Sequence, residues 1–194
     1  TPHLDQLVWK GMSGLTERVS PGITPGSAPG HLGLFGYDPL KFVIGRGVLE
    51  AVGINFPIRH GDIAARGNFC TVDKKGIISA RRAGRLATRK NAQLCRLLSQ
   101  IKLDGAQVFI QPVKEHRFAL VLRGEGLSHR LSDSDPQREG IAPTEVRALL
   151  PEAATTAKKV NEFVYQASQL LAGHHPANML TLRGFSHLPE LPTM

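Results

Sequence analysis

The stretches Asn68-Phe69-Cys70-Thr71-Val72 and Phe118-Ala119-Leu120-Val121-Leu122 decide the fold class of this chain. Each is a short run dominated by apolar side chains, and runs of this length and composition are typical of β-strands. Residues 106–110 and 179–182 have the same character. The sequence therefore predicts four strands, all of them after residue 62.

Two helices are expected between these strands. Residues 88–101 place four apolar side chains on one helical face, namely Leu94, Leu97, Leu98 and Ile101. In residues 152–171 the apolar side chains recur at spacings of three and four, which is the period of an amphipathic helix. A few strands alternating with a few helices indicate an α+β unit.

The N-terminal part of the chain has a different character. Thr1 is a good N-cap and Pro2 occupies the favoured first helical position, so a helix is expected to begin there and to end at Gly11 or Gly14. Because the chain opens on a helix cap, we expect a strand to precede it in a longer protein. Residues 20–36 are rich in glycine and proline, which predicts an irregular but ordered loop.

The composition argues against several classes of protein. The 194 residues include 41% hydrophobic and 21% charged residues, which is typical of a globular domain. No apolar run approaches the roughly 18 residues that cross a bilayer, and no leader-like segment is seen, so neither a membrane partner nor secretion is expected. Cys70 and Cys95 show no metal-type spacing and are expected to be reduced, semi-buried cysteines of a cytoplasmic protein.

Positive charge is concentrated in one segment. The net charge is +8, and residues 74–90 hold seven basic residues but no acidic or aromatic one. Proteins that bind single-stranded nucleic acid interleave basic residues with stacking aromatic rings, so this segment is a poor platform for that ligand. Binding to duplex phosphates stays open. The overall balance favours an anionic partner.

Ser27 and three arginines are the candidates for chemistry. A serine in a loop rich in glycine and proline is most often a turn residue, and it needs an activating group before it acts as a nucleophile. A metal ion is one such group. The arginines offer planar forks that match phosphate oxygens, although a solvated basic face has the same pattern: Arg81, Arg82 and Arg85.

Longer motifs resemble a known family. Residues 1–5, Thr1-Pro2-His3-Leu4-Asp5, are similar to the TPNLD helix of the alkaline-phosphatase superfamily. The stretch Pro25-Gly26-Ser27-Ala28-Pro29-Gly30-His31, followed by Leu34-Phe35-Gly36-Tyr37-Asp38-Pro39, resembles the PGSDxAH…LGYDP signature of archaeal-type cofactor-independent phosphoglycerate mutases. The match continues in order along almost the whole chain, through Gly45-Arg46-Gly47, Gly61-Asp62, Arg66, Asn68-Phe69, Arg81-Arg82-Ala83-Gly84-Arg85, Leu122-Arg123-Gly124, Ser132-Asp133-Ser134-Asp135-Pro136, Val160-Asn161-Glu162-Phe163 and Leu180-Thr181-Leu182-Arg183-Gly184.

The resemblance implies a fold of α/β and α+β parts. A fragment of an alkaline-phosphatase-like α/β core is expected to be followed by an inserted α+β phosphotransferase domain. Residues 1–58 would belong to the core and residues 59–185 to the inserted, substrate-binding domain. Residues 186–194 would return towards the core.

The resemblance also implies the residues of the site. Ser27 matches the serine that is both a metal ligand and the group transiently phosphorylated. Two divalent cations, drawn from Mn, Zn, Co and Mg, are expected in the full-length enzyme, and 2,3-bisphosphoglycerate is not required. Residues that match the substrate-binding positions are Arg66, Arg82, Arg85, His116 and Asp135.

Two departures from the family pattern stand out. Ala28 and Pro29 follow the serine, where the family usually has an acidic residue, and this difference bears on loop geometry and on activity. The remaining metal ligands are expected outside this chain, so the chain alone is expected to be inactive.

The function implied by the resemblance is interconversion of 3-phosphoglycerate and 2-phosphoglycerate in glycolysis and gluconeogenesis. The expected partner is a small anionic phosphorylated substrate, with no nucleic acid and no membrane, in the cytoplasm. Two alternatives stay open. One is another phosphotransferase or phosphohydrolase of the same superfamily, and the other is a non-enzymatic basic binding module.

Overall fold

The computed structural model describes residues 1–23 and 25–193, and it divides into two compact units, Thr1–Val43 and Ile44–Met194. The first unit begins with helix α1 (Pro2–Lys10), which has Thr1 as its N-cap. The helix ends at Gly11, whose N–H donates to the carbonyl of Leu7 at 2.8 Å. The predicted helix and its end at the first of the two candidate glycines are confirmed.

The loop predicted for residues 20–36 is wrong in part, because helix α2 (Ser27–Leu34) forms within it. Pro29 is tolerated because it lies in the first turn, where backbone N–H groups have no intrahelical acceptor. Gly33 is required for packing, since a Cβ there would overlap the carbonyl of Arg18. The glycine and proline residues therefore shape this helix rather than prevent it.

The second unit is built on one antiparallel sheet. Its strands are β1 (Ile63–Val72), β2 (Ile78–Ala80), β3 (Gln107–Lys114), β4 (Arg117–Arg123) and β5 (Met179–Ser186). The hydrogen-bonded order is β2-β1-β4-β3, and β5 also pairs with β1. The four predicted strands are confirmed and each is longer than predicted, whereas the three-residue β2 was not predicted.

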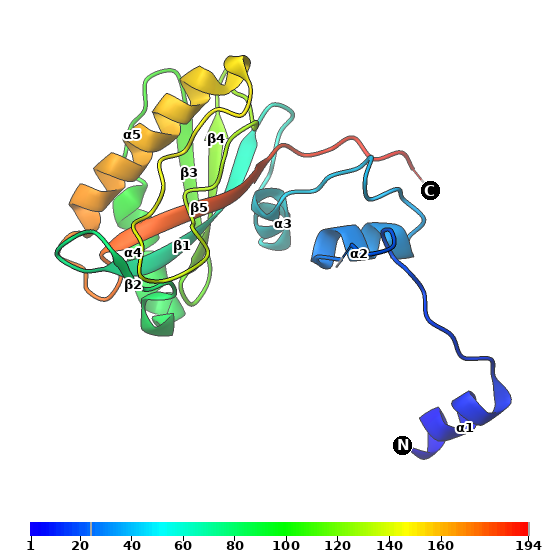
Figure 1. Ribbon diagram of the computed structural model, residues 1–194. Coiled ribbons are helices and arrows are strands. Elements are labelled where there is room, and N and C mark those ends of the chain that lie inside the picture. Colours follow the sequence, from blue (N-terminus) through cyan, green and yellow to red (C-terminus); the bar gives the residue numbers. More distant parts are fainter. Residues whose placement is uncertain (24, 194) are drawn as a thin grey trace. The chain divides into compact units, whose positions relative to one another are not determined.

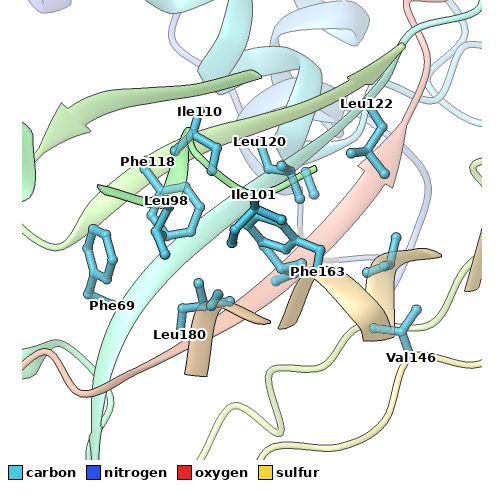
Figure 2. Packing of buried hydrophobic residues seen from close by; sticks show 14 of the residues in the cluster. Phe69, Leu98, Ile101, Ile110, Phe118, Leu120, Leu122, Val146, Phe163 and Leu180 are labelled. Atoms are coloured by element: carbon cyan, nitrogen blue, oxygen red, sulfur yellow. The ribbon is translucent and has the colours of Figure 1, made fainter. Parts of the chain in front are cut away.

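Helices α4 (Thr88–Leu98) and α5 (Ala154–Leu171) cover one face of this sheet, and both were predicted. α5, gold in Figure 1, lies along the strands. The main core lies between the helices and the sheet, and Figure 2 shows Leu98 and Phe163 among the side chains of β4. No helix in the described part of the chain is both long and apolar enough to span a bilayer.

Helix α3 (Arg46–Gly53) packs on the opposite face of the sheet and was not predicted. Gly47 permits this packing, because a Cβ at that position would overlap the backbone of Ala64 in β1. Val48 and Ala51 are buried against Ala64 in a second, smaller core. The fold is thus a mixed arrangement of helices on both faces of a single antiparallel sheet, and α3 covers only part of its face.

The two cysteines are free and fully buried, more deeply than predicted. Burial raises the pKa of the Cys70 thiol and of the Cys95 thiol to about 12. The Cys95 thiol lies 3.0 Å from Oδ1 of Asn91. Both side chains serve packing, because thiols of such high pKa are poor nucleophiles.

Candidate functional site

Helix α3 covers only part of its face of the sheet. Four polar side chains lie on the uncovered part of that same face. Arg66 and Asn68 are two positions apart on β1, so they point to the same face as Ala64. Residues directly opposite each other in an antiparallel pair also share a face. Arg117 of β4 lies opposite Asn68, and Arg183 of β5 lies opposite Arg66. Strand register alone therefore gathers three arginines and an asparagine.

These side chains form one wall of a pocket of about 500 Å³, which we call the arginine pocket. Six arginines and one histidine line it, against a single lining carboxylate. The lining residues are Arg66, Asn68, Arg81, Arg82, Arg85, Glu115, His116, Arg117, Gln137 and Arg183. A concave site with this excess of fixed positive charge is built for an anion.

A strained turn completes the pocket. The 3-10 turn η1 (Ala83–Arg85) follows β2, and Ala83, Gly84 and Arg85 all have positive φ, at 42, 64 and 55°. Residues other than glycine disfavour this conformation, because their Cβ atom crowds the backbone. Two more lining residues, Glu115 and Gln137, have φ of 52 and 59°. Strained backbone of this kind is typical of ligand clamps, and here it is concentrated at one pocket.

Two buried carboxylates each hold a pair of pocket arginines. Nη2 of Arg81 lies 3.0 Å from Oδ2 of Asp135, and Nε of Arg183 lies 3.8 Å from the same oxygen. The Asp135 side chain is only 3% exposed. The second carboxylate, Glu50, pairs with Arg66 and with Arg117. These ion pairs fix the position of four of the six guanidinium groups.

Arg82 and Arg85 are different, because both are exposed and neither has a carboxylate partner among the described residues. Their charges are available to a ligand. Lys74 and Lys75, which belong to the same basic segment of the sequence, lie instead in the turn between β1 and β2. The structure thus separates the basic segment into pocket residues and surface residues.

Unsatisfied polar atoms are concentrated in the arginine pocket. Among the described residues, six buried side-chain nitrogen or oxygen atoms have no hydrogen-bond partner, and five of them belong to lining residues. The five are Nε of Arg66, Oδ1 of Asn68, Nε of Arg81, Nδ1 of His116 and Nε of Arg183. Buried polar groups are satisfied by protein, water or ligand in most native structures, so the arginine pocket is the place where bound water or a ligand would complete the hydrogen bonds.

Burial also changes the proton affinity of the lining groups. Desolvation lowers the pKa of Arg66 and the pKa of Arg183, although the neighbouring carboxylates oppose this effect. Desolvation, with the charges of Arg117 and Arg82, lowers the pKa of His116 to about 4. His116 is therefore neutral at pH 7, and its imidazole offers one donor and one acceptor.

The structure brings together four of the six predicted site residues, since Arg66, Arg82, Arg85 and His116 all line the arginine pocket. Asp135 lies behind the lining and touches it through Arg81 and Arg183. The sequence-based prediction missed Arg117, Arg183 and Asn68 as site residues. Only Asn68 lies within a predicted strand, whereas Arg117 and Arg183 reach the site through strand register, which the sequence does not state.

Ser27 lies in the first unit, Thr1–Val43. It is the first residue of α2 and is exposed, and Gly26 is the N-cap. Its carbonyl lies 2.6 Å from Nδ1 of His31, which sits one turn later. Serine at this point of a helix has free backbone N–H groups and the positive end of the helix dipole beside it. This environment favours a phosphoryl group.

Comparisons with known proteins identify the family of this chain. Residues 9–178 match the family model of 2,3-bisphosphoglycerate-independent phosphoglycerate mutase. A protein of Aquifex aeolicus named "Probable 2,3-bisphosphoglycerate-independent phosphoglycerate mutase" is 46% identical over 203 positions, covering 100% of this chain and 50% of the relative. A protein of the same name from Thermus thermophilus is 41% identical, covering 100% of this chain and 48% of the relative.

Solved structures give the same result. The cofactor-independent phosphoglycerate mutase of Thermoplasma acidophilum matches with a TM-score of 0.71 and 36% identity, over 84% of this chain and 47% of that chain. The PH0037 protein of Pyrococcus horikoshii matches with a TM-score of 0.66 and 24% identity, over 90% of this chain and 41% of that chain, and shows the fold alone. The chain spans about half the length of the curated relatives it matches. The predicted family is confirmed: this chain belongs to the 2,3-bisphosphoglycerate-independent phosphoglycerate mutases.

Proposed function

We propose that this chain forms the substrate-binding half of an enzyme that interconverts 3-phosphoglycerate and 2-phosphoglycerate without 2,3-bisphosphoglycerate. The observation that carries the proposal is the cluster of buried polar atoms without a hydrogen-bond partner in the arginine pocket. Leaving such groups unsatisfied costs about 1–3 kcal/mol each, and an anionic ligand would offset that cost at the arginine Nε–H donors. A phosphoglycerate has a phosphate at one end and a carboxylate at the other, and arginine forks match both groups.

We assign different tasks to the two sets of arginines. Arg82 and Arg85, which have no carboxylate partner, would bind the phosphoryl group and neutralise the charge that develops on it. The four arginines held by carboxylates would present fixed donors to the rest of the substrate. A glycerate held on several sides would stay in place during the reaction, which is the benefit of positioning.

We propose that Ser27 carries the phosphoryl group transiently. Its hydroxyl oxygen would form a bond to phosphorus while the bond from phosphorus to the glycerate oxygen breaks. The serine would lose its proton, and the glycerate oxygen would gain one. The other glycerate hydroxyl would then take the phosphoryl group, and the serine hydroxyl would be restored. Support comes from the place of Ser27 at the start of α2, where the helix N-terminus stabilises an anion.

The family resemblance calls for two divalent cations, which would supply activation of the serine hydroxyl. Among residues 1–23 and 25–193, no group of three or more His, Cys, Asp or Glu side chains is placed to hold a metal ion. The residues present therefore do not fit a two-metal site by themselves. A metal-ligand role for Ser27 stays a prediction, and no step above depends on it.

The domain arrangement is part of the proposal. Residues 1–58 would belong to an alkaline-phosphatase-like core, residues 59–185 to an inserted phosphotransferase domain, and residues 186–194 to the return towards the core. Support comes from the sheet, whose first strand begins at Ile63 and whose last strand ends at Ser186.

We place the enzyme in the cytoplasm, which the two free, buried cysteines support.

The experiment uses the full-length protein with 3-phosphoglycerate and no added 2,3-bisphosphoglycerate. Formation of 2-phosphoglycerate, followed by ³¹P NMR, is the expected result. The same protein is tested with a panel of other phosphomonoesters and with duplex DNA at low and high salt. Turnover of another phosphoester alone would favour a different phosphotransferase. DNA binding with a steep salt dependence and no turnover would favour a basic binding module.

A further inference from the structure

Glu50 is a buried carboxylate behind the arginines that line the pocket. It lies on α3, its side chain is 6% exposed, and it forms ion pairs with Arg66 and with Arg117. We propose that Glu50 is a positioning residue, which holds these two arginines in the geometry that binds the anion. The inference rests on the proposed function for the identity of the substrate, but not for the binding of an anion.

Glu50 holds each of the two guanidinium groups through one terminal nitrogen. Nη2 of Arg66 pairs with Oε1 of Glu50, while Nε of the same arginine is buried and has no hydrogen-bond partner. Nη1 of Arg117 lies 3.7 Å from the same oxygen. Because a guanidinium is planar and rigid, fixing one edge sets the direction of the remaining donors. The carboxylate therefore fixes the guanidinium group of Arg66, a residue that lines the arginine pocket.

The backbone of α3 makes Glu50 a rigid support. Val48 and Ala51 are buried against the sheet on either side of it, at 2% and 0% exposure. Gly47 brings the helix into direct contact with the backbone of β1, the strand that carries Arg66. Side chains that bind ligands need such a second layer of support, since a small loosening of the first layer reduces binding.

A purely structural ion pair is the alternative, and the molecule provides a matched control for it. Asp62 is 1% exposed in its side chain and receives two hydrogen bonds of 2.7 Å from Arg123. Arg123 lies at the opposite end of β4 from Arg117, and it does not line the arginine pocket. Both carboxylates are therefore buried partners of a β4 arginine, but only Glu50 holds arginines that line the pocket.

Two effects of removing the Glu50 charge have opposite signs. A neutral residue would leave the pocket more positive, which by itself would strengthen anion binding. Loss of the ion pairs would release Arg66 and Arg117, and this loss of fixed geometry would weaken anion binding. The positioning role predicts that the second effect dominates, so anion affinity decides between the two.

The test compares Glu50→Gln with Asp62→Asn in the full-length protein. Calorimetry with inorganic phosphate measures anion affinity, and mutase assays measure kcat and KM. We expect Glu50→Gln to raise the dissociation constant for phosphate at least about tenfold, and Asp62→Asn to leave it within about twofold although both variants lose stability. The ¹H–¹⁵N signal of the Arg66 Nε–H group should broaden in Glu50→Gln and persist in Asp62→Asn.

If Glu50→Gln fails to fold, Glu50→Asp takes its place, because it keeps the charge and withdraws the carboxylate by one methylene. We expect it to bind phosphate several-fold more weakly than the wild type. Wild-type or tighter phosphate binding in whichever variant folds would overturn the inference. Weaker phosphate binding in a protein that does not turn over phosphoglycerate would leave the inference standing and remove the proposed function.

Discussion

Nη2 of Arg81 donates hydrogen bonds to both carboxylate oxygens of Asp135, at 3.2 and 3.0 Å. The aspartate also accepts a hydrogen bond of 2.9 Å from the backbone N–H of Gln137, another residue of the arginine pocket. Asp135 therefore links Arg81, which precedes the strained turn η1, to Gln137. Removing it would leave the charge of Arg81 partly buried without compensation.

We predict that Asp135→Ala lowers the free energy of unfolding by about 3 kcal/mol, because breaking a buried ion pair from one side leaves an unpaired charge. Urea denaturation measures the change. Glu125→Gln is the control, since Glu125 is exposed and lies in a turn away from the pocket, and its effect should stay within about 0.5 kcal/mol. Equal stability of the two variants would contradict the role of Asp135 as the buried partner of Arg81.

Arg82 and Arg85 should tolerate no replacement by lysine. An ammonium group cannot form bidentate contacts with phosphate oxygens, so Arg82→Lys and Arg85→Lys should each lower kcat of the full-length enzyme by about tenfold to hundredfold. Since the contact strengthens in the transition state, KM should change less. Lys74→Ala and Lys75→Ala are the controls and should retain wild-type kinetics. If all four variants behave alike, the two arginines do not bind the phosphoryl group.

Ser27→Ala should abolish mutase activity while preserving the fold. The side chain is exposed and is not the N-cap of α2, so its removal should change the free energy of unfolding by less than about 0.5 kcal/mol. Mass spectrometry of the wild-type enzyme with substrate should detect phosphate on the peptide that contains Ser27. Ser20→Ala, in the same segment, should keep full activity. Appreciable turnover by Ser27→Ala would exclude the phosphoserine mechanism.

His116 should make the protein less stable as the pH falls. Its pKa is about 4 in the folded state, against an ordinary value of 6.5, so between these values the unfolded chain binds the extra proton. Stability from this residue is complete above pH 6.5 and is lost progressively towards pH 4. The loss should reach about 2–3 kcal/mol. It is measured as the difference in unfolding free energy between wild type and His116→Gln, and a difference that does not change with pH would contradict the prediction.

Two glycines of α3 should respond in opposite ways to the same substitution. Gly47→Ala places a methyl group against the backbone of Ala64 and should cost about 2 kcal/mol, as overpacking of a core does. Gly53→Ala, at the end of the same helix, meets no atom and has no positive φ, so it should be neutral or stabilise by up to about 1 kcal/mol. Thermal unfolding compares the two. A similar loss at both positions would mean that helix propensity, not contact with β1, sets the effect.

The sequence was informative where local pattern decides structure and silent where packing decides it. Apolar runs predicted four strands, and the 3.6-residue period predicted α4 and α5, because burial on one face leaves a repeating trace. Helices α2 and α3 were not predicted, since their glycines and Pro29 resemble loop residues until the close contact with Arg18 or Ala64 is known. Sequence patterns over a few neighbouring residues cannot reveal contacts with residues elsewhere in the chain.

The candidate site followed the same division. Arg82 and Arg85 are close in sequence and formed a visible cluster, and the family motifs added Arg66 and His116. Arg183 was missed because its place opposite Arg66 depends on strand register, which the sequence does not state. The ion pairs of Glu50 were equally hidden, because they require α3 to lie on the sheet.

The pairing of β5 with β1 has a consequence for the order of folding. β5 is the last strand in the sequence and β1 the first, so Arg183 meets Arg66 only after the intervening residues have been made. Contacts between such distant segments form slowly, because loop closure must come first. A nascent chain that lacks β5 would expose most of one edge of β1 and would have an incomplete anion site. A phosphate-bearing ligand would therefore bind and stabilise only the chain whose sheet is complete.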